Sequence, residues 1–303
     1  MIRLDNSPFN SYLREISDRV TTELGRILPA EWDVPDNLVQ SMSYSLMAGG
    51  KRLRPLLVIA AAESLGASRV AALPVACAVE MVHTYSLIHD DLPAMDNDDF
   101  RRGKPTNHKV FGEAMAVLAG DGLLTHAFYS VVQAARQQGV PAEAALAIVE
   151  ELSRYAGPAG MVGGQAADME GEQGITDLEH LRYIHEHKTG DLIVFCLKAG
   201  GRIASATAAQ LHALETYGRS IGLAFQIQDD ILDLIGDEAK LGKKTQSDVK
   251  QGKVTYPYFL GLEQSRAEVD RLTRLAKDAV TNGSISEPSR LLQIADYLLQ
   301  RDH

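Results

Sequence analysis

The sequence lacks most of the features that mark secreted, membrane-spanning or disulfide-bonded proteins. Cys77 and Cys196 are the only two cysteines among 303 residues, which excludes a disulfide framework and is typical of a reducing compartment. Uninterrupted apolar runs are short, and the longest, such as residues 56–62, fall far below the length of a membrane span. Asp5 and Asn6 stand where a secretory signal would have its apolar segment. We therefore expect a cytoplasmic protein with no membrane insertion.

Basic residues are also in the minority. Lys and Arg number 30 against 40 Asp and Glu, which gives a formal net charge of −10 and an isoelectric point near 5.4. This balance disfavours nucleic acid or an anionic membrane surface as the main partner. It does not exclude anionic substrates, because bound metals and local clusters of Lys and Arg can reverse the field inside a cleft.

No stretch of alternating β-branched residues predicts a strand, and the spacing of apolar residues is helical instead. A Ser7-Pro8 start followed by apolar residues that step by three and four indicates an N-terminal helix: Phe9, Tyr12, Leu13, Ile16, Val20, Leu24 and Ile27. A longer helical pattern covers about residues 207–235. Because no fixed repeat and no linker-like break is present, we predict one all-α domain spanning residues 1–303.

Local signals predict where some helices begin and end. Thr176-x-x-Glu179 predicts a capping box that opens a helix running toward Lys188, and Gly200-Gly201 is expected to end the following helix. Loops are expected at 92–108, 170–174 and 236–252. The first and last of these follow clusters of aspartates and are rich in Lys, Arg, Gly and Asp, which is typical of mobile segments that close over bound phosphates.

Two aspartate clusters more than a hundred residues apart carry the most information. The first contains Asp90, Asp91 and Asp96, and the second contains Asp229, Asp230 and Asp233. Carboxylates at this density repel one another unless cations lie between them, and ligand sets made only of oxygen favour hard ions such as Mg²⁺. Two such clusters on opposite sides of a cavity could hold one diphosphate through shared metals.

Helical spacing gives the second cluster a geometry. Gln226, Asp229, Asp230 and Asp233 stand at positions i, i+3, i+4 and i+7, which places them on one stripe of a helix. A solvated acidic face is the alternative, but structural faces usually mix charges of both signs, and here apolar residues flank the stripe with no intervening Lys. The pattern therefore favours a metal-binding stripe.

The first cluster follows a buried helix over residues 75–88, so Asp90 and Asp91 oppose the negative end of the helix dipole and need another source of stabilisation. Asp96 is expected to fold back toward Asp90 after the helix ends. An EF-hand fits poorly, because the required glycine and closing glutamate are missing. Arg101 and Arg102 come soon afterwards, so that acidic groups suited to metal stand beside basic groups suited to phosphate.

A second basic segment, residues 49–55, opens another helix and contains Lys51 and Arg54. Glycines there allow close approach of the backbone, and arginine can contact phosphate oxygens with two hydrogen bonds. Taken alone, a basic helix start is more often plain surface. His83 lies on the same helix face as Asp90, where a lone histidine is more often a hydrogen-bonded core residue than a ligand.

The chain combines both aspartate clusters with the segment Gly50-Lys51-Arg52-Leu53-Arg54-Pro55, with Gly163-Gly164-Gln165 and with Lys188-Thr189-Gly190. With this set it resembles the trans-isoprenyl diphosphate synthases, most closely those of bacteria that make farnesyl diphosphate. The resemblance implies an all-α bundle around a deep central cavity and a homodimer. It implies head-to-tail (1'-4) condensation of isopentenyl diphosphate with dimethylallyl and geranyl diphosphates to give farnesyl diphosphate. Geranyl or geranylgeranyl diphosphate remains an alternative product.

The resemblance also assigns roles by matching position. Direct Mg²⁺ ligands, for three ions per active site, would be Asp90, Asp96 and Asp229, with supporting or bridging roles for Asp91, Asp230 and Asp233. Isopentenyl diphosphate would be held by Lys51, Arg54, His83 and Arg102. The allylic substrate would be held by Arg101, Lys188, Thr189, Gln226, Lys243 and Lys253.

Product length is a separate question, and it centres on Tyr85 and Ser86, the fifth and fourth residues before Asp90. Tyr85 lies about 7.5 Å deeper along the helix than Asp90, by the rise per residue. In the resembled family, bulk at this position accompanies short products, so the ring is expected to floor the hydrocarbon cavity. Simple core packing is the alternative for a lone aromatic residue.

Other functions fit the same residues less well. An all-α metal phosphohydrolase, suggested by His83 and His89-Asp90, would leave the second aspartate cluster without a role. A di-iron bundle needs two Glu-x-x-His pairs, and Glu80-x-x-His83 is the only one in the sequence. A terpene cyclase would not need the isopentenyl-binding set. A non-catalytic subunit of a synthase is disfavoured by the intact second cluster.

Overall fold

A computed structural model describes residues 7–26, 28–29, 31–171, 174, 177–235 and 254–299. Over these residues the chain is almost entirely helical, which confirms the predicted all-α class, and the only strands are two residues long each. The single-domain boundary at 1–303 stays a prediction.

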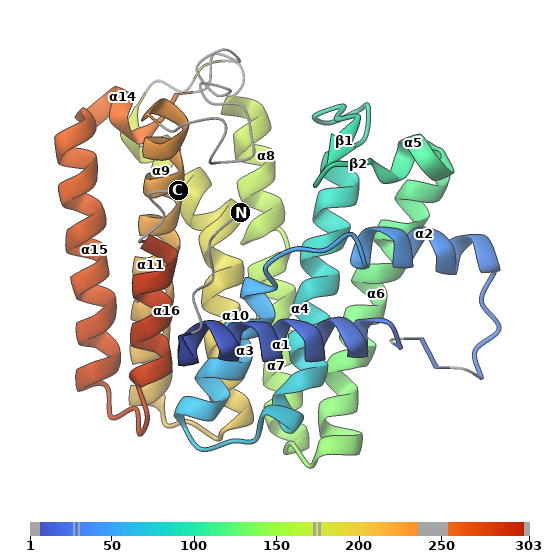
Figure 1. Ribbon diagram of the computed structural model, residues 1–303, viewed down its shortest axis with the longest axis horizontal. Helices are drawn as coiled ribbons and strands as arrows, with labels where there is room; N and C mark the ends of the chain where they lie inside the picture. Colours follow the sequence, from blue (N-terminus) through green and yellow to red (C-terminus); the bar gives the residue numbers. More distant parts are fainter. Residues whose placement is uncertain are drawn as a thin grey trace.

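The elements follow one another as a series of helices with one short hairpin (Figure 1). The N-terminal half contains α1 (Pro8–Leu24), α2 (Asp36–Leu46), α3 (Leu53–Ser64), α4 (Arg69–Asp90), β1 (Phe100–Arg101), β2 (Lys104–Pro105), α5 (Asn107–Phe111), α6 (Glu113–Gln138) and α7 (Ala142–Ala156). The C-terminal half contains α8 (Met161–Gly171), α9 (Leu178–Ile184), the π-helix η1 (His185–Gly190), α10 (Asp191–Ile203), α11 (Ala208–Ile235), α14 (Tyr256–Leu260), α15 (Leu262–Asn282) and α16 (Ser289–Leu299).

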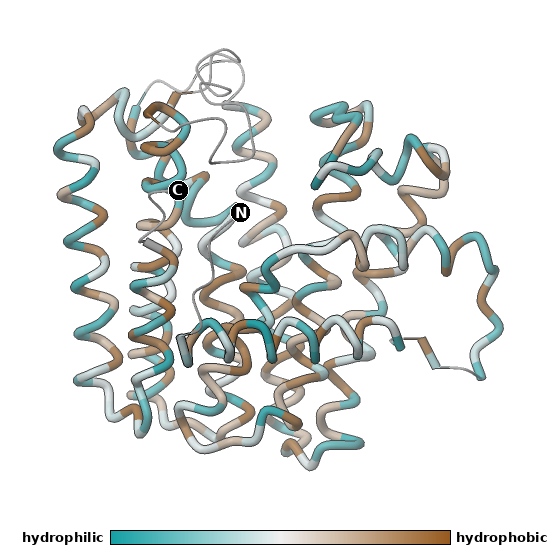
Figure 2. Tube along the Cα trace, viewed as in Figure 1, coloured by the Kyte–Doolittle hydropathy of each residue, from teal (hydrophilic) through white to brown (hydrophobic). Residues whose placement is uncertain are grey.

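Helices α4, α10 and α11 form the centre of the molecule. Helix α4 packs along α6 and α3, α10 packs against α3, α7 and α11, and α11 is covered by α15 (Figure 1). The helix α3 is apolar all round, and its residues 55–62 are all buried, as expected for a core helix. In Figure 2, hydrophilic and hydrophobic residues alternate along α15, which is typical of a helix with one solvated face.

The chain leaves α4 at the end of the molecule where α8, α9, α14 and the β1–β2 hairpin gather, the upper end in Figure 1. The first aspartate cluster therefore sits at this end, directly after α4. The second cluster occupies the last turns of α11. Hydrogen bonds described below tie those turns to η1 and α14, so both clusters belong to the same end.

Several local predictions are confirmed and others need correction. Ser7 caps α1 by accepting a hydrogen bond from the backbone N–H of Asn10, and α11 matches the long predicted helix. In contrast, α9 begins at Leu178, and its N-cap is Asp177, which accepts from the N–H of His180 at 2.8 Å. The predicted cap Thr176 lies outside the described residues. Because the Asp177 carboxylate performs the capping, the helix starts one residue later than expected.

The prediction that Gly200-Gly201 ends a helix is wrong, because α10 continues to Ile203. A Cβ on Gly200 would lie 2.4 Å from the carbonyl oxygen of Val58, so this glycine lets α10 and α3 pack with their backbones in contact. The glycine pair is therefore a helix-packing feature, and its sequence signal was misread as a terminator.

The expected absence of membrane insertion stays a prediction. Two helices of the described residues, α4 and α6, are long and apolar enough to span a bilayer by length and composition. The most apolar window of α4 is 72% buried inside the fold, and that of α6 is 39% buried. The apolar character of α4 is therefore explained by the core, whereas α6 keeps an apolar face outside it.

Candidate active site

The first aspartate cluster is built at the C-terminus of α4. Asp90 is the last residue of the helix and Asp91 is its C-cap. The N–H of Asp96 donates to the carbonyl oxygen of Asp90 at 2.9 Å, so the chain folds back as the sequence predicted. Asp90 is half-buried and Asp96 is exposed, which leaves the two predicted metal ligands on the open side of this turn.

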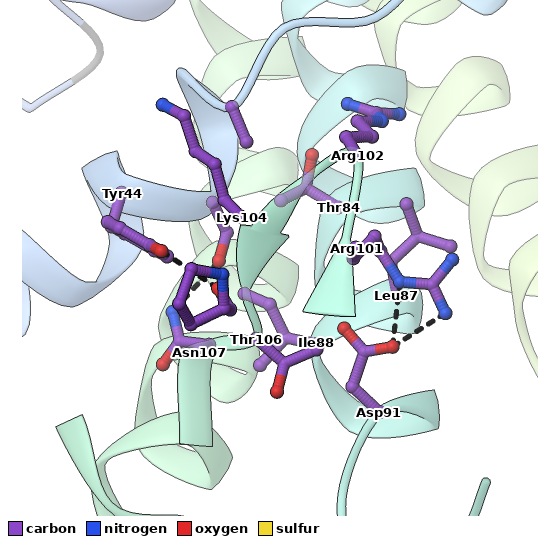
Figure 3. Close-up of a pocket in the computed structure, with 13 residues that line it drawn as sticks. Tyr44, Thr84, Leu87, Ile88, Asp91, Arg101, Arg102, Lys104, Thr106 and Asn107 are labelled. Atoms are coloured by element: carbon purple, nitrogen blue, oxygen red, sulfur yellow. Dashed lines mark hydrogen bonds and ion pairs between the residues drawn. The ribbon is translucent and has the colours of Figure 1, made fainter. Parts of the chain in front are cut away.

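Asp91 is bound within the protein. It is 3% exposed, and one of its carboxylate oxygens accepts from Arg101 Nε at 2.7 Å and from Nη2 at 2.6 Å (Figure 3). Burial raises the pKa of Asp91, and the hydrogen bond and charge of Arg101 oppose that rise. The supporting role that the resemblance assigned to Asp91 stays a prediction. Arg101, assigned to the allylic substrate, is held at the site by this ion pair.

Asp90 lies among charges of both signs. Gln165 of α8 donates from Nε2 to its carboxylate at 2.7 Å. Burial raises the pKa of Asp90, the positive charge of Lys188 lowers it, and the neighbouring Asp96 raises it again. This is the environment in which a divalent cation gives the largest gain, because it would remove the repulsion between the carboxylates.

Lys188 reaches this cluster from η1, a single π-helical segment between α9 and α10. Its Nζ donates to Asp168 of α8 at 2.6 Å, and the charges of Asp168, Asp90 and Asp96 all raise its pKa against the effect of burial. A Cβ on Gly164 would lie 2.1 Å from the backbone N of Lys188, so only glycine allows α8 to approach so closely. Irregular π segments of this kind are frequent at functional sites.

Sequence reasoning gave no role to two of these residues. Gln165 was noted only as part of a motif, and Asp168 was not singled out at all. The usable signal was spacing: Gln165 directly follows Gly164, and Asp168 stands three residues later on α8, so the two side chains lie on the same helix face.

The second cluster is confirmed as part of one helix, but its members have different surroundings. Asp230 is 8% exposed, accepts from the N–H of Tyr256 at 2.9 Å and lies 3.1 Å from His185 Nε2. It therefore ties α11 to the start of α14 and to η1. Asp233 is buried, whereas Gln226 and Asp229 are half-buried on the same helix. These positions suit a direct ligand role for Asp229 and a supporting role for Asp230.

The residues predicted to hold isopentenyl diphosphate come from three segments, which are the start of α3, the helix α4 and the β1–β2 hairpin: Lys51, Arg54, His83 and Arg102. Burial lowers the pKa of His83 well below its usual value, and the nearby charges of Arg54, Arg102, Arg101 and Arg52 lower it further. The Nε of Arg54 is buried without a hydrogen-bond partner among the described residues. A neutral histidine surrounded by guanidinium groups marks a region of positive potential that fits an anion.

The hairpin delivers Arg102 to this region. Arg102 and Gly103 both have positive φ, +53° and +75°, as a two-residue hairpin turn of type I′ requires. The guanidinium of Arg102 donates to the carbonyl oxygen of Gly49 in the basic segment. A Cβ on Gly50 would lie 2.8 Å from Arg102 Nη1, so glycine at this position leaves room for the arginine. This hairpin, inside a predicted loop, was not foreseen.

The sequence analysis also missed a buried ion pair beneath the anion site. Arg52 is 3% exposed and donates to Glu80 of α4 at 2.6 Å and to the carbonyl oxygen of Leu46 at 2.6 Å. Glu80 lies three residues before His83 on α4, so the pair fixes the basic segment next to that histidine. The Glu-x-x-His spacing, considered above for di-iron, is explained by this pair.

The two residues proposed to set product length lie on α4 below the aspartates. Tyr85 is 6% exposed, and its ring meets the ring of His89 edge-on with centroids 5.8 Å apart. His89 in turn lies 3.0 Å from the carbonyl oxygen of Val117 of α6. Ser86 is half-buried and donates back to the carbonyl oxygen of His83. The role of Tyr85 in product length stays a prediction, as does the deep central cavity.

Thr189 is half-buried on η1, next to Lys188. Lys243 and Lys253, both assigned to the allylic substrate, lie outside the described residues.

The carboxylates fit Mg²⁺ by their chemistry. Asp90 and Asp96 offer oxygen ligands joined by a backbone hydrogen bond, and the repulsion between them raises the pKa of Asp90. Within the described part of the chain, no three His, Cys, Asp or Glu residues form a complete metal-binding group. In proteins, Mg²⁺ typically binds through one or two carboxylates and completes its shell with water and substrate phosphates.

Comparison with known proteins shows to which family the chain belongs. The polyprenyl synthetase family matches residues 35–287. The chain belongs to the polyprenyl synthetase family. Among its relatives, the farnesyl diphosphate synthase of Bacillus subtilis (strain 168) is 49% identical over 293 residues, covering 97% of this chain and 98% of the relative. The chloroplastic geranylgeranyl pyrophosphate synthase of Catharanthus roseus is 47% identical over 271 residues, covering 89% and 75%.

A solved structure agrees with the fold of this polyprenyl synthetase. The crystal structure of an FPP/GFPP synthase from Zymomonas mobilis superimposes with a TM-score of 0.84 at 37% sequence identity, covering 96% of this chain and 98% of the other. The predicted resemblance and the all-α fold are therefore confirmed, and the protein is a prenyltransferase.

Proposed function

We propose that this prenyltransferase condenses isopentenyl diphosphate head-to-tail with dimethylallyl and then geranyl diphosphate, and that farnesyl diphosphate is its product. The observation that carries the proposal is that α4 carries both a histidine among arginines and the first aspartate cluster. His83 lies among arginines, and Asp90 ends the same helix seven residues later. Seven residues correspond to about 10 Å of helix, a separation at which two diphosphates can lie side by side.

Separate sets of residues act on the two substrates. Lys51, Arg54, His83 and Arg102 bind the diphosphate of isopentenyl diphosphate and hold its double bond beside the allylic carbon, which removes most of the entropic cost of the encounter. Lys188 and Arg101 place positive charge next to the first aspartate cluster, where the allylic diphosphate departs.

Magnesium ions, three per site with Asp90, Asp96 and Asp229 as direct ligands, would neutralise the charge that develops on the departing diphosphate. The allylic fragment then carries positive charge, and the oxygens of Thr189 and Gln226 stabilise it as dipoles without attacking it. We assign the final proton to the departing diphosphate, as the family resemblance implies.

Two observations favour farnesyl diphosphate over a longer product. The relative from Bacillus subtilis is named as a farnesyl diphosphate synthase, and the ring of Tyr85 is buried on α4 below the aspartates. Overall identity alone does not decide product length, because a geranylgeranyl synthase is almost as similar. Geranyl or geranylgeranyl diphosphate therefore remains the alternative product.

The experiment that tests the function is an incubation with dimethylallyl diphosphate and radiolabelled isopentenyl diphosphate, followed by chromatography of the dephosphorylated products. We expect a fifteen-carbon alcohol as the main product, and diphosphate release only when both substrates are present. Chelation of Mg²⁺ by EDTA should reduce the rate to background, and added Mg²⁺ should restore it. Release of phosphate from either substrate alone would support a phosphohydrolase and contradict the proposal.

We also propose that the protein works as a homodimer in the cytoplasm. The support for a dimer is the outer surface of α6 and α7, where large apolar side chains are exposed: Val117, Leu118, Val132 and Leu146. Leu118 is 53% exposed and Leu146 is 69% exposed. Large apolar side chains exposed on two neighbouring helices are typical of an interaction surface, and a second copy of the chain is the partner that the family resemblance implies.

Sedimentation velocity tests the dimer. Wild-type protein should sediment as a dimer, and Leu118→Glu should shift it toward monomer because a buried charge would be left unpaired in the interface. Leu275→Glu is the matched control, since Leu275 is a similarly exposed leucine on α15. A monomeric wild type, or equal dissociation by both variants, would contradict the proposed interface.

A further inference from the structure

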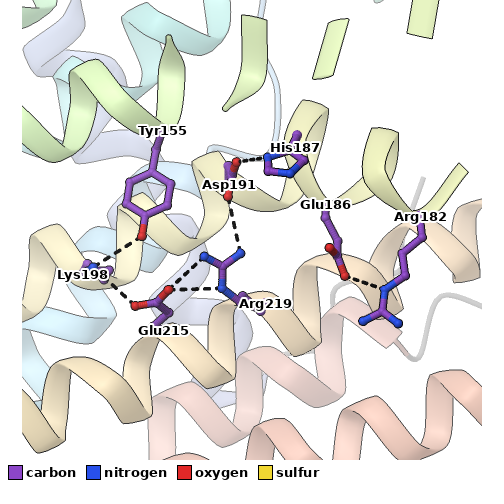
Figure 4. A network of polar contacts seen from close by, with 8 residues as sticks. All are labelled: Tyr155, Arg182, Glu186, His187, Asp191, Lys198, Glu215 and Arg219. Carbon is purple, nitrogen blue, oxygen red and sulfur yellow. Dashed lines mark hydrogen bonds and ion pairs between the residues drawn. The ribbon is translucent and has the colours of Figure 1, made fainter. Parts of the chain in front are cut away.

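A chain of polar contacts lies next to η1, apart from the aspartate clusters (Figure 4). His187 of η1 lies with its Nδ1 2.6 Å from Asp191 Oδ2, and Asp191 is the first residue of α10. The other carboxylate oxygen of Asp191 lies 3.6 Å from the guanidinium of Arg219, which comes from α11. The three side chains thus join η1, α10 and α11 at the junction where the π-helix becomes an α-helix.

The Asp191 carboxylate is only 3% exposed, so it depends on these partners. Burial raises its pKa, and the hydrogen bond from His187 and the charge of Arg219 oppose that rise. A buried carboxylate that loses its partner destabilises the surrounding structure much more than an exposed one. Loss of either partner is therefore expected to destabilise the position of Asp191.

The junction is important because of the residues that it contains. Lys188 and Thr189 follow His187 directly, and Lys188 interacts with Asp168, Asp90 and Asp96. A π-helical turn is rarely stable by itself and needs support from its surroundings. Sliding the register by one residue toward a regular α-helix would turn Lys188 and Thr189 away by about 100°, the rotation per residue.

Backbone contacts support η1 on two other sides. A Cβ on Gly164 of α8 would lie 2.1 Å from the backbone N of Lys188, and a Cβ on Gly222 of α11 would lie 3.1 Å from the Cα of Gly190. These contacts limit how far the segment can move, but close packing of glycines does not specify which residue faces which neighbour. The ion pair between Asp191, at the end of η1, and Arg219 of α11 does specify it, and the bond from His187 to Asp191 is a local i, i+4 contact that supports the Asp191 side chain.

We propose that His187, Asp191 and Arg219 are positioning residues that hold η1 in its π-helical register and so place Lys188 and Thr189 in the active site. The proposal rests on the function proposed above and adds residues to it that no motif singled out. None of the three is assigned contact with a substrate. Their effect is transmitted through η1.

The alternative is that these residues only stabilise the fold. Glu151 provides a control that distinguishes the two roles. Glu151 of α7 is also a largely buried carboxylate, 13% exposed, and lies 2.9 Å from Arg202 Nη2 and 3.3 Å from Lys198 Nζ of α10. Glu151 has two partners, as Asp191 has His187 and Arg219, but neither partner of Glu151 lies on η1. Loss of Glu151 should therefore lower stability without changing the register of η1.

The experiment compares Asp191→Ala and His187→Leu with Glu151→Ala, after wild-type turnover has been measured as a separate test of the proposed function. We expect kcat to fall about 10–100-fold in the first two variants, because a misplacement of about 1 Å in a positioning group costs on this order. The KM for isopentenyl diphosphate should stay within about twofold, since its site lies on α3, α4 and the hairpin. His187→Asn keeps a donor near the Nδ1 position and should recover most of the rate.

Hydrogen exchange gives a readout that does not depend on turnover. The amides of residues 185–190 should exchange at least about tenfold faster in Asp191→Ala than in wild type, and at an unchanged rate in Glu151→Ala, even if both variants lose similar thermal stability. The proposal is overturned if Glu151→Ala lowers kcat as much as Asp191→Ala does. It is also overturned if Asp191→Ala keeps wild-type kcat and wild-type exchange in η1.

Discussion

Replacing Asp229 with Ala is expected to lower kcat by at least about 10²–10³-fold, the loss that follows removal of a preorganised charge-stabilising group. Asp229 is half-buried on α11, one residue before Asp230, which ties the helix to η1 and α14. The side chain is thus carried by a helix that is fixed on two sides. Because the proposed role of Asp229 is direct binding of Mg²⁺, its loss should raise the Mg²⁺ concentration needed for half-maximal rate as well.

Steady-state kinetics at several Mg²⁺ concentrations provide the measurement. Asp278→Ala, an exposed aspartate on α15, is the control and should keep the wild-type rate. A wild-type kcat in Asp229→Ala would refute catalytic use of the second cluster. An equal loss in Asp278→Ala would show that the effect comes from general destabilisation.

Replacing Tyr85 with Ala is expected to change the main product from fifteen carbons to twenty or more. The ring is buried on α4, about 7.5 Å below Asp90 by the rise per residue, and faces the ring of His89. Its removal would open space for at least one more five-carbon unit at the floor of the predicted cavity. Product chain length, measured by chromatography, is the readout.

Tyr85→Phe is the matched control, because it keeps the ring and should keep farnesyl diphosphate as the product. Truncation of a buried aromatic to Ala also destabilises a protein by roughly 3–5 kcal/mol, so the thermal midpoint of each variant has to be measured in parallel. An unchanged product profile from a folded Tyr85→Ala protein would remove Tyr85 from the account of chain length.

The sequence was sufficient for the fold class and for the residues of the two clusters because periodic patterns are local. The three-and-four spacing of apolar residues predicted α1 and α11, and the i, i+3, i+4, i+7 pattern placed the second cluster on one helix. It could not show that Asp230 would turn toward His185 and Tyr256, since that depends on which neighbour packs against each side of α11.

The errors have a common physical origin in tertiary contacts. Gly200 looked like a helix end, but it lies inside α10 because α3 packs against it at backbone distance. The π-helical form of η1 and the ion pair between Arg52 and Glu80 likewise depend on partners distant in the sequence. Propensity describes a residue in isolation, and here close packing between helices overrode it.

The most direct test of the central claim is a crystal structure with Mg²⁺ and an unreactive thio analogue of dimethylallyl diphosphate. We expect Mg²⁺ ions bound to Asp90 and Asp96 on one side and to Asp229 on the other, with the analogue's diphosphate oxygens completing their coordination and Lys188 close by. Mg²⁺ bound to only one of the two aspartate clusters, or a diphosphate located away from both, would contradict the account.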